Sequence, residues 1–334
     1  ILATISLTLI AIMSVNYYVD SYWSFNHSHI FEEYQRGNRE RQQKSNALFF
    51  RDQQYNTVIF GSSRTAYMNQ NTWDDTTFNY AASDMQPSEY KPYLDFALNE
   101  AKQPIKRVII GLDFFGALEY ASPVSSQSDS ILSIISSPLY RYKLLLSRDA
   151  LDYSIKNIKY YFTQPTQKYN SENSKISQRN INVTEEEYLQ SIQGGLEGYV
   201  RDRYSYPYDM TYKETIQNLI NSYPDIEFIV FTTPVSKAHF NAIQSSNLYT
   251  LYERWIEESV EVFEKVHHFM YLNELTSSPY LYFLDSNHGF NSTYDCLTLE
   301  ILGKDSSCPK SNMTITKENV DEMLKALRTL NGIN

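Results

Sequence analysis

The sequence is poor in cysteine and has no long run of basic residues, and each shortage excludes a class of function. Only Cys296 and Cys308 occur in 334 residues, and the Cys and His spacing of zinc modules is missing. The formal net charge is −10, whereas a nucleic-acid-binding protein needs a basic face for the phosphates. We therefore expect no metal, no cofactor and no nucleic-acid partner.

The first nineteen residues, 1–19, carry no charged side chain and are close to the length of helix that crosses a bilayer. The alternative is a cleaved signal peptide, but the small residues of a cleavage site do not follow. We expect an uncleaved anchor, with residues ahead of Ile1, so the charge bias that fixes its orientation cannot be read. Four aromatic residues are expected to form a belt at the membrane surface: Tyr17, Tyr18, Tyr22 and Trp23.

The two cysteines form a close pair in a chain with an export segment, which predicts a disulfide and an oxidising compartment. Everything after Asp20 is therefore expected outside the cytoplasm, in the periplasm or at the cell surface. Residues 20–56 are polar, and we expect a solvated juxtamembrane helix or stalk that carries four basic side chains: Arg36, Arg39, Arg41 and Lys44.

Hydrophobic residues make up 42% of the chain, enough to bury one large core in an α/β domain at 57–334. Short apolar runs alternate with helical patterns, which predicts a doubly wound, three-layer fold with a parallel sheet. The predicted strands are 57–60, 77–80, 107–113, 227–232 and 280–284. The predicted helices are 87–101, 212–222, 248–266 and 316–330, with His267 and His268 at a helix end.

A long segment, 117–208, separates the third and fourth predicted strands and is far longer than a crossover helix needs. It leaves from the carboxyl end of a strand, where lids over ligand sites start. A peripheral helical insertion is the alternative, and the sequence does not separate the two.

A serine, an acid and a base each follow a predicted strand. Gly61 ends the first apolar run and permits a sharp turn that leaves Ser63 at the carboxyl end of the strand, where open α/β sheets bind ligands. Far downstream, Asp285 and His288 follow the last predicted strand. A serine attacks an ester when a histidine takes its proton and an acid orients that histidine.

These blocks resemble the SGNH (GDSL-like) hydrolase superfamily, in which a Gly-Asp-Ser block opens the fold and an Asp-x-x-His block closes it. The resemblance covers scattered blocks between Thr57 and Gly289 and implies a catalytic triad of Ser63, His288 and Asp285. Ser62 stands in the place of the family's aspartate. This Gly-Ser-Ser form is similar to membrane-anchored envelope members, such as the D-alanyl transfer protein and envelope O-acyltransferases.

The blocks that supply the family's oxyanion hole differ here. Ser83 and Asp84 stand in the second block without its glycine, and Asp113 replaces the asparagine of the third. At about 4 Å and an effective dielectric of about 20, an ionised Asp113 would oppose the oxyanion by roughly 4 kcal/mol. Asp113 is expected to be protonated, to point away or to pair with Arg64; otherwise hydrolysis of simple esters is not the reaction that this protein performs. Backbone N–H groups of Ser63 and of Ser83 or Asp84 remain as donors.

His239, after the fourth predicted strand, is expected to be accessible, in an exposed turn or at the pocket.

Two candidate functions follow from these predicted site residues. The first is an anchored extracytoplasmic esterase or O-acyltransferase, with an envelope polysaccharide and an acyl donor as substrates. The second is a non-catalytic SGNH-like subunit that binds glycan or assists a membrane-bound acyltransferase or export complex.

Overall fold

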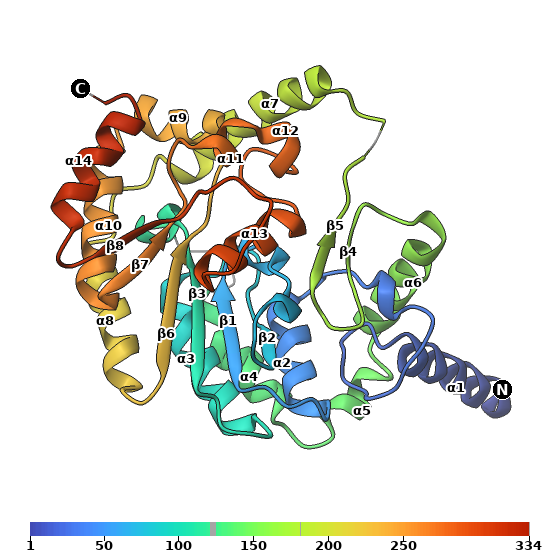
Figure 1. The fold of residues 1–334 in the computed structure, drawn as a ribbon. Helices are drawn as coiled ribbons and strands as arrows, with labels where there is room; N and C mark the ends of the chain where they lie inside the picture. The colour runs from blue at the N-terminus through green and yellow to red at the C-terminus, as the bar shows by residue number, and fades with distance from the viewer. Residues whose placement is uncertain (121–124, 181, 334) are drawn as a thin grey trace.

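The computed structural model describes residues 1–120, 125–180 and 182–333, and its core is a mixed six-stranded sheet (Figure 1). The strand order is β2-β1-β3-β6-β7-β8, and only β8 is antiparallel to its neighbour. The bounds are β1 (Thr57–Gly61), β2 (Thr77–Asn79), β3 (Arg107–Leu112), β6 (Glu227–Thr232), β7 (Lys265–His268) and β8 (Met313–Thr316). The predicted α/β class and mostly parallel sheet are confirmed.

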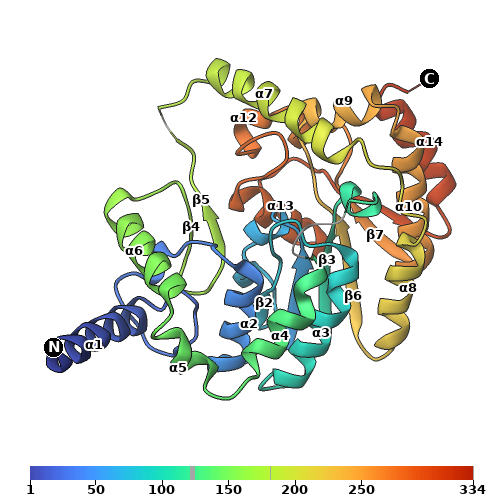
Figure 2. The same cartoon turned by 180° about the vertical axis from the view of Figure 1, so that it is seen from behind.

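Helices cover both faces of this sheet. Along β1, Val58 and Phe60 belong to one core cluster, whereas Ile59 between them belongs to a second cluster with Tyr294 and Leu297 of α13. Figures 1 and 2 accordingly show α3 and α4 on one face and α13 on the other. The helices are α1 (Leu2–Val19), α2 (Glu40–Phe50), α3 (Pro87–Glu100), α4 (Ser128–Ile135), α5 (Tyr140–Leu144), α6 (Arg148–Thr163), α7 (Glu185–Arg203), α8 (Tyr212–Ser222), α9 (Lys237–Ser245), α10 (Tyr249–Phe263), α11 (Glu274–Ser277), α12 (Pro279–Tyr282), α13 (Asn291–Ile301) and α14 (Val320–Leu330).

The last predicted strand was placed wrongly. Residues 280–284 are not a strand, because Pro279 starts the short helix α12 and Leu281 points to solvent with 62% of its surface exposed. The strand is instead β7, which pairs with β6 at Phe231 and His267. His267 and His268 therefore lie in the sheet and not at a helix end, since α10 stops at Phe263.

Segment 117–208 connects β3 to the region before α8. Its described residues form α4 to α7 and a separate antiparallel pair, β4 (Gln167–Tyr169) and β5 (Lys175–Ser177). Figure 1 places α5, α6 and this hairpin beside the β2 edge of the sheet, while α7 lies at the top of the view, near α9 and α12.

The polar segment before β1 is packed into the protein, so the predicted solvated helix face is wrong for α2. Lys44 is fully buried and its Nζ donates to the carbonyl of Asn79, 2.8 Å away. Arg41 forms two hydrogen bonds with the buried Glu89 of α3, at 2.6 and 2.8 Å. Both side chains bind polar groups inside the fold, a role that composition alone does not distinguish from solvation.

Helix α1 is long and apolar enough to cross a membrane, although a signal sequence passes the same test. Tyr17 and Tyr18 are exposed, as the predicted belt requires. The predicted belt is wrong for Tyr22 and Trp23, because these side chains are 5% and 1% exposed and pack within the protein. The predicted disulfide between Cys296 and Cys308 is present, with the two Cα atoms 5.8 Å apart.

We expect His268 to make the fold sensitive to acid. Burial lowers the pKa of His268 to about 3, and the ring bonds to Thr232 and Tyr252 in its neutral form. An unfolded histidine titrates near 6.5, so this contribution to stability is complete above pH ~6.5 and decreases by up to about 1.4 kcal/mol per pH unit as pH falls towards 3. Urea unfolding at several pH values checks this.

In that experiment His268→Gln should lose less stability than the wild-type chain between pH 7 and 4, while the half-exposed His27→Gln serves as the control. An identical pH dependence for wild type and His268→Gln would contradict the assignment.

Candidate active site

The turn after β1 presents one serine and hides the other. Gly61 has a φ of +150°, and a Cβ there would lie 2.3 Å from Thr65 Oγ1, so only glycine fits. Ser62 is fully buried, whereas Ser63 is partly exposed. β1 is also where the strand order reverses, with β2 on one side and β3 on the other. Ser63 therefore lies at the switch point where open α/β sheets bind ligands.

The structure brings Ser63, His288 and Asp285 into one hydrogen-bonded chain. Ser63 Oγ lies 2.8 Å from His288 Nε2, and His288 Nδ1 lies 2.8 Å from Asp285 Oδ2. A proton on Nδ1, donated to the carboxylate, leaves Nε2 free to accept the serine proton. The His288 side chain is 23% exposed, so a substrate can reach this end of the chain.

The carboxylate of Asp285 is held ionised. Its Oδ1 accepts the backbone N–H groups of Asn287 and His288, at 2.9 and 2.8 Å. Partial burial alone would raise its pKa, but the adjacent His288 and these hydrogen bonds outweigh burial and hold the pKa of Asp285 well below its ordinary value. An ionised acid can orient the imidazole and stabilise its protonated form.

Tyr188 of α7 supports the loop that carries the acid and the base, and sequence reasoning missed it. Its hydroxyl lies 3.0 Å from the carbonyls of Pro279 and Phe283 and 3.3 Å from that of Asp285. No local signal marks Tyr188 among 29 tyrosines, since its role depends on a loop about a hundred residues downstream. Part of segment 117–208 thus contacts the loop that carries Asp285 and His288.

Arg64 and Asp113 form a buried ion pair directly behind Ser63. Arg64 is 1% exposed, and its Nη1 lies 3.0 Å from Asp113 Oδ1. Nη2 donates to the hydroxyl of Tyr199 at 2.8 Å, and the hydroxyl of Thr233 donates to Asp113. The carboxylate of Asp113 is therefore neutralised by Arg64, one of the arrangements expected from the sequence.

The backbone donors expected at Ser83 and Asp84 are only partly available. The backbone N–H of Ser83 donates to Glu40 Oε2 at 2.6 Å, so it cannot also serve an oxyanion in this conformation. Asp84 has a positive φ of 54° and pairs with Arg203 of α7 at 3.1 Å. Its carboxylate is thereby held by α7.

His239 is not accessible, and the expectation of an exposed or pocket-lining histidine is wrong. It is fully buried in α9, with Nε2 2.8 Å from the hydroxyl of Tyr204 and Nδ1 3.2 Å from Ser286 Oγ. Burial lowers its pKa well below the ordinary value, so the ring is neutral. Because Ser286 follows Asp285, His239 packs behind the acid loop and supports it.

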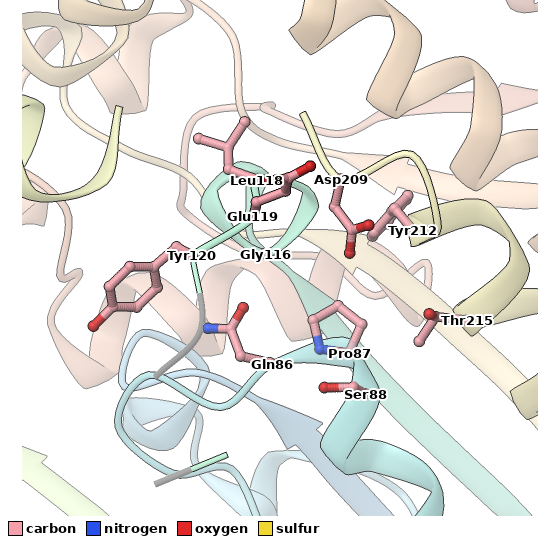
Figure 3. A pocket seen from close by; sticks show the side chains of 10 residues that line it. All are labelled: Gln86, Pro87, Ser88, Gly116, Leu118, Glu119, Tyr120, Asp209, Tyr212 and Thr215. Carbon is pink, nitrogen blue, oxygen red and sulfur yellow. The ribbon is translucent and has the colours of Figure 1, made fainter. Parts of the chain in front are cut away.

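A cavity of about 210 Å³ adjoins the loop that leads to Asp285 and His288, between the hairpin β4–β5, α7 and α12. Its lining includes Arg179, Tyr188, Tyr280, Leu284 and Phe290. Another cavity, of about 250 Å³, lies beside the N-terminus of α3, where Pro87, Glu119, Asp209 and Tyr212 surround it (Figure 3).

Comparisons with known proteins add no identification: no family model matches the chain, and no curated protein matches its sequence. Within residues 1–120, 125–180 and 182–333, no group of three His, Cys, Asp or Glu side chains is placed to hold a metal ion. The side-chain geometry of the site is therefore the basis on which its function is inferred.

Proposed function

We propose that this protein is a serine esterase or O-acyltransferase of the SGNH type, anchored in the membrane and acting outside the cytoplasm. The observation that carries the proposal is the hydrogen-bonded chain from Ser63 through His288 to Asp285. An accessible serine, a histidine with one nitrogen directed at it and an ionised acid on the other nitrogen are the parts that acyl transfer needs.

In the proposed reaction, Ser63 Oγ attacks the carbonyl carbon of an ester while His288 Nε2 takes the serine proton. The bond from that carbon to the leaving alcohol oxygen then breaks, and His288 returns the proton to the alcohol. A second hydroxyl, from water or from an acceptor, gives its proton to His288 and attacks the acyl-serine. The bond from the acyl carbon to Ser63 Oγ then breaks, and His288 returns the proton to Ser63. Water as acceptor gives hydrolysis, and a glycan hydroxyl gives transfer.

The oxyanion needs donors that are not already engaged. Asp113 does not oppose the developing charge, because Arg64 neutralises it within the protein. With the N–H of Ser83 bonded to Glu40, the backbone N–H groups of Ser63 and Asp84 are the candidate donors. Removing one such donor in serine enzymes costs about a hundredfold or more in rate.

An envelope polysaccharide bearing O-acyl groups is the proposed substrate. The cavity beside the triad loop is lined by aromatic side chains, among them Tyr188, Tyr280 and Phe290, with the Arg179 guanidinium 4.2 Å from the centre of the Tyr280 ring. Aromatic faces with a few polar groups suit sugar rings. A membrane-bound acyltransferase is the proposed partner that would supply the acyl group.

Labelling with a fluorophosphonate probe tests the proposal. The probe reacts with serines activated by a histidine, so the purified full chain should form one covalent adduct, and mass spectrometry of its peptides should place that adduct on Ser63. The chain denatured before the probe is added is the control. A folded protein that forms no adduct would contradict the enzymatic proposal.

A non-catalytic, glycan-binding subunit is the second candidate, and the occupied N–H of Ser83 is the observation in its favour. Absence of labelling together with retained binding of O-acylated polysaccharide would support this function.

A further inference from the structure

Helix α6 has two adjacent faces with different surroundings. Ala150, Ser154 and Asn157 are buried, and Ser154 Oγ lies 3.3 Å from the side chains of Asn16 and Ser21. An apolar stripe lies beside this buried face, shifted by one residue along α6, and it faces outward. In this stripe Ile155 is 43% exposed and Phe162 is 76% exposed. Since the inner face already packs on the end of α1 and on the residues just after it, this stripe is a second and separate contact surface.

The exposed apolar surface continues through the chain before α6. Leu139, Tyr142 and Leu146 are 67%, 50% and 53% exposed, Tyr142 within the short helix α5 and the other two just outside its ends. Large apolar side chains that gather on one side of a protein mark an interaction site, whereas single exposed ones do not. We define the α5–α6 surface as these five residues: Leu139, Tyr142, Leu146, Ile155 and Phe162.

The α5–α6 surface lies where α1 leaves the body of the protein. Asn16, in the last turns of α1, donates from Nδ2 to the carbonyls of Leu145 and Ser147, at 2.9 and 3.3 Å, on either side of Leu146. Figures 1 and 2 both show α5 and α6 on the side of the molecule from which α1 projects. A bilayer crossed by α1 would therefore begin beside Leu146.

The charge of this region differs from that of the whole chain. Between Leu139 and Thr163 there are five basic and two acidic residues, in a protein whose net charge is −10. Lys143, Arg148, Lys156 and Lys159 are exposed. Basic side chains next to an apolar stripe are typical of helices that lie in the interface of a membrane with anionic lipids, where the aliphatic stems stay at the apolar boundary.

We propose that the α5–α6 surface rests on the lipid headgroups of the membrane that α1 spans, and that it binds anionic phospholipid. This inference depends on α1 as a membrane anchor and is independent of the proposed chemistry at Ser63. Contact between this surface and the headgroups holds the body of the protein against the bilayer, whereas α1 alone would leave the body free to move. Lipid, and not a second protein, is the occupant because the apolar stripe, the basic residues and the anchor meet at one place.

Single-cysteine labelling of the full chain in vesicles tests this, because both native cysteines are in the disulfide. An environment-sensitive fluorophore is attached at Ile155→Cys or Phe162→Cys, with Leu281→Cys, 62% exposed, as the water-exposed control. At 155 and 162 we expect a blue shift and strong quenching by spin-labelled lipid, larger when phosphatidylglycerol is added to phosphatidylcholine. The label at 281 should show neither.

A label at Leu9→Cys on α1 reports separately on the anchor. Lipid quenching at 9 with none at 155 and 162 would overturn the α5–α6 surface, and a label at 9 that stays in water would overturn the anchor and the proposal together. Lys156→Glu combined with Lys159→Glu should remove the extra quenching by phosphatidylglycerol at 162. Unchanged quenching in that variant would overturn the preference for anionic lipid.

Discussion

Ser63→Ala is expected to abolish fluorophosphonate labelling and to reduce hydrolysis of an activated ester by at least about a thousandfold. The alanine lacks the hydroxyl that lies 2.8 Å from His288 Nε2, so no acyl-serine can form, and knockouts of this kind cost on the order of a millionfold in a serine protease. Because Ser63 is only partly buried, the variant should fold. Its circular dichroism spectrum and urea midpoint check that.

Ser62→Ala is the matched control, since it removes the neighbouring hydroxyl of the same turn. Ser62 is buried and accepts the backbone N–H of Arg64 at 3.2 Å, so the change should lower stability by about 1 kcal/mol and leave labelling of the folded protein in place. Labelling that survives Ser63→Ala, or that is lost equally in both variants, would remove the nucleophile assignment and favour the glycan-binding function.

Breaking the buried ion pair is expected to have the largest effect on stability. Arg64→Met leaves the carboxylate of Asp113 buried without its cation, and Asp113→Asn leaves the guanidinium of Arg64 uncompensated. Each single change should lower the free energy of unfolding by about 3–5 kcal/mol, the usual cost of removing one partner of a buried pair. Urea denaturation of each variant and of the wild-type protein measures this.

The double variant Arg64→Met with Asp113→Leu should recover much of that loss, because it leaves no unpaired charge in the core. The exposed pair of Lys91 and Asp95, at 2.9 Å, is the surface control, and Asp95→Ala should cost roughly 0–1 kcal/mol. A loss at Asp113→Asn no larger than at Asp95→Ala would contradict the role of the buried pair.

Asp113→Asn also separates stability from chemistry. With the carboxylate neutralised by Arg64, esterase activity per folded molecule should change little or increase. A loss of about a hundredfold would show that the carboxylate itself takes part in the reaction, for example by positioning an acceptor hydroxyl.

The sequence alone determined the features that depend on near neighbours in the chain. The apolar run before Gly61 predicted β1 and the turn that presents Ser63, and the three-residue spacing of Asp285 and His288 placed the acid and the base on one loop. Residues 87–101 and 212–222 were recognised as helices by start signals and periodicity, which are also local. These predictions hold because few residues, adjacent in sequence, decide the backbone conformation.

The tertiary structure decided everything that depends on burial and on distant partners. The apolar run at 280–284 forms a short helix and a loop, because the strand that pairs with β6 is β7. The burial of His239 and the loop contacts of Tyr188 join elements far apart in the chain. The sequence around a polar residue is the same whether its hydrogen bonds are made to water or to a buried partner. Only the folded structure therefore shows that Asp113 is paired with Arg64.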